Sequence, residues 1–208
     1  MIAPRSRRLL TASLATQLRS LRRDQQGAAI LEFALIAPVF LMLVIGTLDL
    51  GQMAYGTAVL NGAVQKAARD SALETSSTIQ ADNLVKSIVS PVLPGVIVST
   101  ARKSYFDFVD VGRPEKWNDA NSNGTCDNHE SYVDENDNGT WNSDIGESGN
   151  GGASDVIIYT VTAKYKPIFK VPFIPTSWNQ RTLTAKAVRK NQPYASQQVY
   201  SAKSGICT

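Results

Sequence analysis

The hydrophobic positions of the chain begin with one long run near its start. Residues 28–48 read AAILEFALIAPVFLMLVIGTL, in which Glu32 is the single charged residue. At roughly 1.5 Å rise per residue, a helix over this run spans about 31 Å, the thickness of a bilayer's hydrocarbon core. Beyond it, apolar and small residues recur at helical spacing as far as position 73. The pattern predicts one helix over residues 28–73, half in lipid and half amphipathic.

Shorter patterns follow this helix. Apolar residues on one face predict a second helix over residues 81–90, which Pro91 and Pro94 end. Stretches rich in β-branched and aromatic residues predict strands at 96–100, 105–111, 155–165 and 182–189. The fold class is therefore α+β, a long N-terminal transmembrane helix that extends into a small antiparallel sheet domain. A Pro-rich apolar stretch at 167–178 either packs under the sheet, which we favour, or touches the membrane surface.

Charge is distributed unevenly along the chain. Residues 1–23 hold six Arg and no acid, residues 117–155 hold nine acids and no Lys or Arg, and residues 156–208 hold eight Lys or Arg and no acid. Basic residues before an apolar span favour a cytoplasmic N-terminus. The expected organisation is a cytoplasmic basic leader at 1–27, a single inner-membrane span at 28–48 and a periplasmic domain at 49–208. The basic C-terminal block lacks a nucleic-acid motif, so we expect no nucleic-acid partner.

Two other interpretations of the apolar run stay open. It could be a buried core helix, although a domain of this size seldom hides such a run. It could also be a cleaved secretory signal, but the run is long and no clean A-x-A site follows it. The best candidate is at residues 54–56, after Asp49 and Gln52.

The most specific motif lies in the acidic block. The pattern D-x-[DN]-x-[DN]-G-x5-E of calcium-binding loops is matched in full from residue 119. The matching residues are Asp119, Asn121, Asn123, Gly124, Thr125 through its carbonyl, Asp127 and Glu130. Ca²⁺ takes six to eight hard oxygens, which a tight loop with Gly at its turn can supply. We expect a structural Ca²⁺ here.

A second copy begins fifteen residues later. Its matching residues are Asp134, Asn136, Asn138, Gly139, Thr140 and Asn142. Ile145 stands where the first copy has its last glutamate, so Asp144 or Glu147 would have to substitute. We expect a weaker or shared ion there, within an insertion at 113–154. The alternative for both copies is a disordered Asn/Gly/Asp-rich surface loop.

Cysteine use leaves a question open. Cys126 and Cys207 are the two cysteines, and their spacing excludes a CxxC metal site. In an oxidising compartment they could bond to each other, or each could stay free or bond another chain.

A resemblance to a known family enters through the start of the helix. Residues 26–35, QGAAILEFAL, resemble the start of TadE-like proteins of the tight-adherence (Flp) pilus system, and the likeness continues to position 73. The strand, Pro-rich loop and strand at 156–189 are loosely similar too. The resemblance implies a pilin-like domain, a pseudopilin or assembly role, and partners among other pilin-like subunits and the pilus machinery.

The resemblance also implies processing in some members. A prepilin peptidase would cut between Gly27 and Ala28, leaving Glu32 at the fifth mature position, just before Phe33. A carboxylate within an apolar helix is costly and needs a partner. In a packed filament, Glu32 could pair with the new amine of a neighbour's Ala28, or it could simply reach water at the interface.

Three function classes compete. The first is a minor pilin-like component of tight-adherence pilus biogenesis with a calcium-stabilised periplasmic domain. The second is an enzyme on a membrane stalk, which we do not expect because one His and no nucleophile–base pair offer little catalytic machinery. The third is a membrane-anchored, calcium-dependent adhesive module that needs no pilus proteins.

Overall fold

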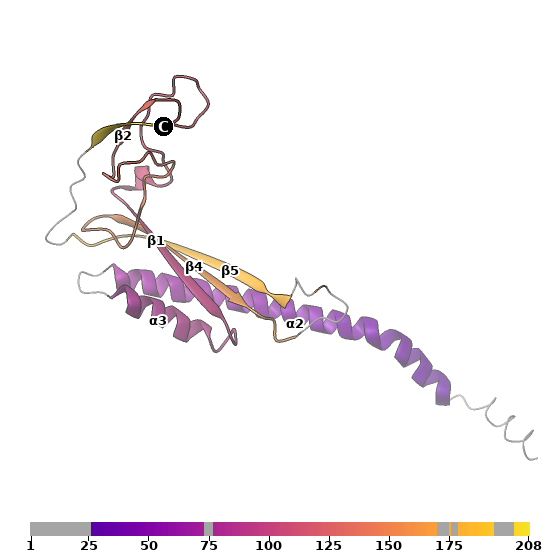
Figure 1. Cartoon of the computed structure of the whole chain (residues 1–208). Helices are drawn as coiled ribbons and strands as arrows, with labels where there is room; N and C mark the ends of the chain where they lie inside the picture. The colour runs from indigo at the N-terminus through magenta and orange to yellow at the C-terminus, as the bar shows by residue number, and fades with distance from the viewer. Residues whose placement is uncertain (1–25, 73–76, 170–174, 176–178, 194–201) are drawn as a thin grey trace, which may run out of the picture. The chain divides into compact units, whose positions relative to one another are not determined.

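The computed structural model describes residues 26–72, 77–169, 175, 179–193 and 202–208 of the 208-residue chain. It divides into two compact units, residues 1–48 and residues 49–208. Residues 1–25 of the predicted basic leader and most of the Pro-rich stretch lie outside the described residues. Helix α2, Gln26–Ser71, continues without interruption across the boundary between the units (Figure 1).

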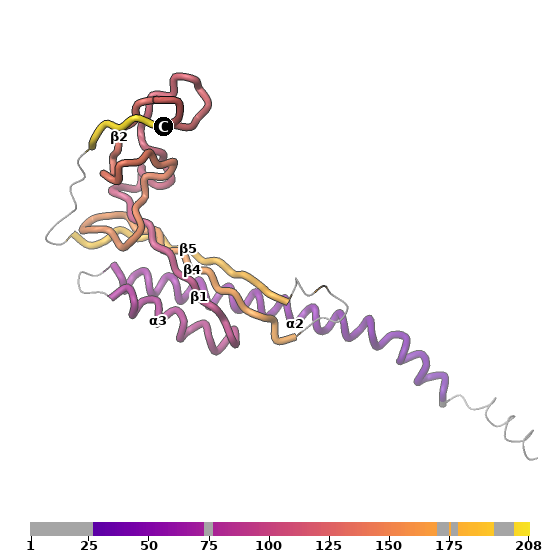
Figure 2. Tube along the Cα trace, in the orientation of Figure 1, coloured from indigo at the N-terminus to yellow at the C-terminus, as the bar shows by residue number. Residues whose placement is uncertain are grey.

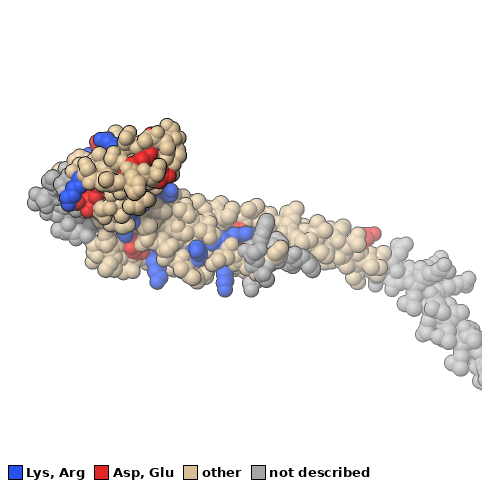
Figure 3. Space-filling view, turned by 45° about the horizontal axis from the view of Figure 1, so that its top comes forward, with Lys and Arg blue, Asp and Glu red and all other residues tan. Residues whose placement is uncertain are grey.

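The described part of the first unit is the apolar half of α2. Its large side chains are exposed, among them Leu35 at 81% and Phe33 at 71%. Pro38 lies inside the helix without ending it. In Figure 3 this stretch is almost wholly tan beside the grey N-terminal residues, in keeping with a single charge in residues 28–48. Within the described residues, one helix is long and apolar enough to cross a membrane, and α2 is that helix. The predicted long apolar helix is confirmed, and its length and composition would allow it to cross a membrane.

The second unit combines the rest of α2 with a short helix and two sheets (Figure 1). Its further elements are α3 (Thr78–Val89), β1 (Ile97–Tyr105), η1 (Phe108–Asp110), β2 (Ser131–Asp134), β3 (Glu147–Ser148), β4 (Val156–Tyr165), β5 (Arg181–Lys190) and β6 (Lys203–Ile206). The larger sheet has the order β3-β1-β4-β5 and is antiparallel throughout. The smaller sheet pairs β2 with β6, and Figure 2 shows the yellow C-terminal segment beside β2. The α+β class with a small antiparallel sheet is confirmed.

One face of the larger sheet packs against the two helices. Along β4 and β5, buried and more exposed residues alternate, so every second side chain faces the core. The core cluster comprises Leu60, Ala63, Val64, Ala67 and Ala68 of α2, Ala81, Val85 and Val89 of α3, Leu93, Tyr159, Val161, Ala163 and Tyr165 of β4, and Leu183, Ala185 and Ala187 of β5. A Cβ at Gly56 would lie 2.9 Å from the Leu93 side chain, so a larger residue there would force that side chain to shift. The amphipathic half of α2 therefore forms one side of the hydrophobic core of the domain.

One predicted strand is wrong. Residues 105–111 do not form a strand, because β1 already ends at Tyr105 and residues 108–110 form η1. Asp107 and Asp110 cause the change, since each carboxylate accepts a hydrogen bond from a backbone N–H of this turn, in a capping box. The aromatic residues Phe106 and Phe108 suggested a strand, but the Asp side chains stabilise a turn instead.

Candidate functional site

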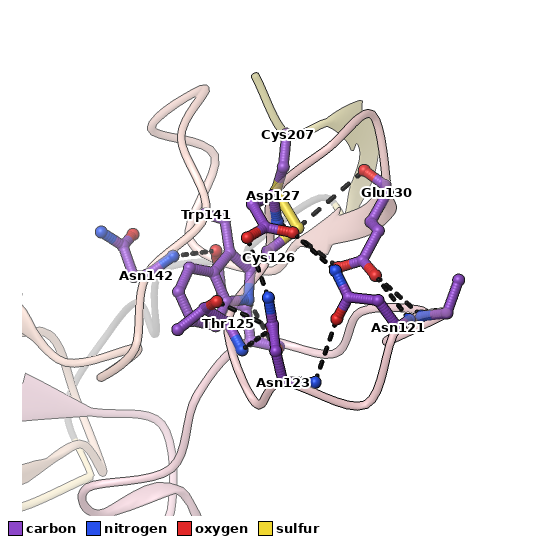
Figure 4. The surroundings of a disulfide bond; sticks show 11 residues. Asn121, Asn123, Thr125, Cys126, Asp127, Glu130, Trp141, Asn142 and Cys207 are labelled. Atoms are coloured by element: carbon purple, nitrogen blue, oxygen red, sulfur yellow. Dashed lines mark hydrogen bonds between the residues drawn. A yellow bond between two sulfur atoms is a disulfide. The ribbon is translucent and has the colours of Figure 1, made fainter.

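The acidic insertion folds together with the distant β6. We call residues 113–146 and 203–207 the loop module. Strand β2 pairs with β6, and the backbone of Cys207 bonds to His129 and Glu130. A disulfide joins Cys126 to Cys207 across 81 positions of sequence, with the two Cα atoms 5.7 Å apart. The question that the sequence left open is answered, since the two cysteines bond to each other (Figure 4).

The first loop, residues 119–130, is tightly hydrogen-bonded. The Asp119 carboxylate accepts backbone N–H groups of Asn123 and Gly124, each at 3.0 Å. The side-chain oxygen of Asn121 accepts the Asn123 N–H at 3.0 Å, and that of Asn123 accepts the Thr125 N–H at 2.8 Å. Gly124 has a φ of +79°, a conformation that favours glycine. The predicted ligands at positions 1, 3 and 5 and the glycine at position 6 thus belong to one turn.

Two further acids close the first loop (Figure 4). Asp127 accepts side-chain amide groups of Asn121 and Asn123, both at 2.9 Å. Glu130 is 6% exposed, and its Oε1 accepts the N–H groups of Ala120 at 2.8 Å and Asn121 at 3.3 Å. Its Oε2 accepts the Asp127 N–H at 3.4 Å. Five of the predicted ligand side chains therefore belong to one hydrogen-bonded cluster.

The second loop repeats this geometry from residue 134. Asp134 accepts the N–H groups of Asn138 at 3.1 Å and Gly139 at 2.7 Å. Asn138 accepts the Thr140 N–H at 2.8 Å, and Gly139 has a φ of +78°. The Asn142 side-chain oxygen, at position 9, accepts amide groups of Asn136 at 3.0 Å and Asn138 at 2.6 Å. Asn142 therefore has the contacts that Asp127 has in the first loop.

Glu115 supplies the carboxylate that the second copy lacks in sequence. Its Oε1 accepts the N–H groups of Glu135 at 2.9 Å and Asn136 at 3.4 Å, and its Oε2 accepts that of Asn142 at 2.9 Å. These are positions 2, 3 and 9 of the second loop, the positions that Glu130 contacts in the first. Glu115 is fully buried. It precedes its loop, whereas Glu130 ends its own, so a search for the motif along the sequence misses it.

The two substitutes that the sequence suggested are engaged elsewhere. Asp144 accepts hydrogen bonds from Lys103 Nζ at 2.5 Å, from the Tyr105 hydroxyl at 3.2 Å and from the Gly146 N–H at 3.1 Å. Burial of Tyr105 and the charge of Asp144 raise the pKa of that hydroxyl to about 12. Glu147 lies in β3 and pairs with Ser104 of β1. Asp144 therefore joins the loop module to β1, and Glu147 belongs to the larger sheet itself.

Several carboxylates in or beside the two loops form no ion pair among the described residues. Other acids of the module are paired: Glu135 with Arg113 at 2.8 Å, Asp137 with Lys203 at 2.6 Å and Asp144 with Lys103. In the described part of the chain, no ion pair with Lys or Arg is formed by Glu115, Asp119, Asp127, Glu130 or Asp134. Three of these carboxylates, Glu115, Glu130 and Asp134, are buried, and carboxylates without an ion pair are candidate ligands for a cation.

The donor set fits Ca²⁺ better than a transition metal. Among the residues that the structure describes, no three His, Cys, Asp or Glu side chains are grouped as a metal centre. Each loop instead mixes two or three carboxylates with Asn oxygens and backbone carbonyls, the hard oxygens that Ca²⁺ prefers. His129 has a φ of +65° within the first loop. The arrangement can hold a cation and offers no evident nucleophile.

The predicted processing residues lie in the first unit. Gly27, Ala28, Glu32 and Phe33 all belong to the first turns of α2, and all four are exposed. The Glu32 carboxylate is thus free to meet a partner outside the chain, but the fold itself does not test cleavage.

Comparison with known proteins identifies this helix. Residues 27–69 match the family model described as TadE-like protein. No curated protein and no solved structure matches the chain. The match covers nearly all of α2 and none of the loop module. Residues 27–69 are therefore similar to TadE-like proteins, as the resemblance predicted.

Proposed function

We propose that the protein is a minor pilin-like component of tight-adherence pilus biogenesis, anchored in the bacterial inner membrane by α2. One observation carries this proposal. The TadE-like match at residues 27–69 covers both the apolar half of α2 and the half that packs into the hydrophobic core. TadE-like proteins belong to the pilus system and are not enzymes. The six Arg before the span favour a cytoplasmic N-terminus and a periplasmic domain.

The test is deletion of the gene and complementation with the full chain. Loss of surface pili on deletion, and recovery with the wild-type chain, is the expected result. Reporter fusions at Ser20 and Ser76 check the orientation, and only the Ser76 fusion should report a periplasmic location. Normal piliation without the protein would overturn the pilus role.

We further propose cleavage between Gly27 and Ala28 by a prepilin peptidase. The support is the sequence resemblance, together with the exposure of Glu32 on the helix. Mass spectrometry of the mature N-terminus, with and without the peptidase, tests it. Gly27→Trp should leave the precursor uncut. Glu32→Gln should insert normally but reduce piliation, and wild-type piliation by this variant would exclude a pairing role.

The loop module is proposed to be a structural Ca²⁺ module. Asp119, Asn121, Asn123, Asp127, Glu130 and the Thr125 carbonyl would hold one ion, and Asp134, Asn136, Asn138, the Thr140 carbonyl and Glu115 a second. What supports this is the repeated geometry and the carboxylates without cationic partners. At a hundredfold excess over its dissociation constant, a bound ion stabilises the fold by about 2.7 kcal/mol.

Calorimetry and melting of the full chain in detergent test this proposal. Sites of this kind outside the cell often bind only at about 10⁻⁴–10⁻³ M, so millimolar Ca²⁺ is required. Binding heat and a melting temperature lowered by a chelator are expected, and Asp119→Ala with Glu130→Ala should remove the first site. If the wild-type chain shows neither binding heat nor a shift in melting temperature, the insertion is an ordinary loop that does not bind Ca²⁺.

A second function deserves one experiment. The loop module lies wholly outside the TadE-like match, which favours a calcium-dependent adhesive role that needs no pilus protein. Surface attachment that depends on Ca²⁺ and persists in cells lacking the rest of the pilus system would support this alternative.

A further inference from the structure

One end of the larger sheet carries exposed apolar and basic residues together. We call Ile97, Lys164, Lys166, Ile168 and Phe169 the basal patch. Ile97 is 66% exposed, Ile168 57% and Phe169 40%. Lys164 and Lys166 are exposed as well, and Ile97 is the register partner of Lys164. The patch is therefore formed where β1 begins and β4 ends. Because Ile168 and Phe169 are exposed, packing in the core does not explain why these positions are apolar.

The basal patch lies beside the part of α2 that directly follows the apolar run. The backbone N–H of Ile168 donates to the side-chain oxygen of Gln52 at 3.2 Å. At the same end of the sheet, Arg181 pairs in register with Tyr165 and donates to Asp49 at 2.7 Å. The patch is thus fixed to residues 49–52, which follow the apolar run 28–48 without a break in the helix.

Helix geometry then sets the depth of the patch. Gln52 comes four residues after Leu48, which is about 6 Å along a helix axis. The headgroup region on each side of the hydrocarbon core is roughly 5–7 Å thick. If residues 28–48 of α2 fill the core, Gln52 of the same helix and the Ile168 N–H bonded to it lie at the level of the lipid headgroups.

The chemistry of the patch suits an anionic lipid surface. Apolar side chains in this region are stabilised at the boundary with the acyl chains, and Lys can place its ammonium group near lipid phosphates. Residues 156–208 contain no acid, so this segment adds no repulsion. The nearby Asp49 carboxylate is already paired with Arg181, and its side chain is only 8% exposed. Both the apolar and the charged components therefore favour contact with lipid.

We propose that the basal patch rests on the membrane that α2 crosses, with Ile168 and Phe169 at the acyl–headgroup boundary and both lysines at anionic phospholipid phosphates. This inference rests on the proposed anchor role of α2. It gives the domain a second contact with the membrane and so restricts its tilt about the end of the span.

The test measures the depth of single labelled positions in the full chain. Ile168→Cys is labelled with a nitroxide, without reductant, so that the Cys126–Cys207 disulfide stays closed. The protein is reconstituted in vesicles of zwitterionic lipid, with and without phosphatidylglycerol. Collision rates with oxygen, which prefers lipid, and with a water-soluble nickel complex report the depth. Val188→Cys is the matched control, an aliphatic residue of β5 that is 45% exposed and lies outside the patch.

The oxygen-to-nickel collision ratio should be several-fold higher at position 168 than at position 188. Lys164→Gln with Lys166→Gln should lower it in vesicles that contain phosphatidylglycerol. Equal, water-like ratios at 168 and 188 would overturn the inference. A label at Leu41→Cys separates the two proposals. If the collision ratio at position 41 is typical of lipid and the ratio at position 168 is typical of water, the patch proposal alone is overturned. If the ratio at position 41 is typical of water, both the anchor and the patch are overturned.

Discussion

Arg181 donates a hydrogen bond of 2.7 Å to Asp49, a residue that lies 132 positions earlier in the chain. Asp49 is the first charged residue after Glu32, and Arg181 is the first residue of β5. The side chain of Asp49 is 8% exposed and that of Arg181 is 24% exposed. This ion pair therefore ties the start of the folded domain on α2 to the last strand of the larger sheet.

Removal of Arg181 should destabilise the domain. Arg181→Met leaves the buried Asp49 carboxylate without its cation, which costs about 3 kcal/mol in comparable buried pairs. Urea unfolding of the full chain in detergent measures the loss. Lys66→Met is the control, because the Lys66–Asp70 pair is exposed at 58% and 48% and such pairs contribute less than about 1 kcal/mol. Equal losses in the two variants would show that Arg181 has no special role.

Glu115 should matter for the second ion, and Asp144 should not. Glu115→Gln keeps the size of the side chain but removes the charge proposed to hold Ca²⁺, so calorimetry should find one fewer ion bound. Asp144→Asn breaks the pair with Lys103 and should leave the number of bound ions unchanged. Loss of an ion in the Asp144 variant, with none lost in the Glu115 variant, would restore the interpretation drawn from sequence.

Opening the disulfide should loosen the loop module. For a loop of 81 positions, the chain-entropy account gives a contribution of about 4–5 kcal/mol. Cys126→Ser with Cys207→Ser should speed hydrogen exchange at the backbone amides of β2 and β6. Amides of β4 and β5 provide the internal control, because they are bonded within the larger sheet. Unchanged exchange in β2 would mean that the hydrogen bonds of the module suffice.

Stability should fall in acid partly through Asp82. Burial alone would raise the pKa of this carboxyl, but hydrogen bonds from Arg102, Tyr159 and Thr100 outweigh it and hold the pKa below its usual value. Because the folded-state pKa is the lower one, the carboxylate stabilises the fold above about pH 4, and this contribution disappears as the pH falls through the folded value.

Urea unfolding between about pH 6 and about pH 3 measures the effect. The Asp82→Asn variant should be less stable near neutrality and should lose less stability on acidification. Asp70→Asn, at an exposed ion pair, serves as the control and should follow wild type. Parallel curves for wild type and Asp82→Asn would contradict the prediction.

The parts of the fold that sequence predicted are those with strong local signals. Helix α2 and strands β4 and β5 were placed within two residues of their observed ends wherever those ends are described, because apolar runs and alternation determine them. Strand β1 was predicted too short, and its neighbour η1 was taken for a strand. Strands β2 and β6 were missed altogether. Each has four residues, and their pairing joins segments about 70 positions apart, so no local pattern marks them.

In the candidate site, too, sequence predicted the contacts between residues close in the chain and missed a contact between distant ones. The two Asp–Asn–Asn–Gly turns were found from spacing, since each is formed within six consecutive residues. Glu115 was not found, because it lies 19 positions before Asp134 and meets the second loop only through the fold. The full burial of Glu115 is what distinguishes it, and only the fold shows that burial.

The pairing of β2 with β6 limits the order in which the fold can form during synthesis. Residues 131–134 are made long before residues 203–206, and β4 and β5 lie between them in the chain. The larger sheet can therefore assemble while the loop module is still incomplete. Throughout that interval Cys126 lacks its disulfide partner. The disulfide can therefore close only after every strand of the larger sheet has been made.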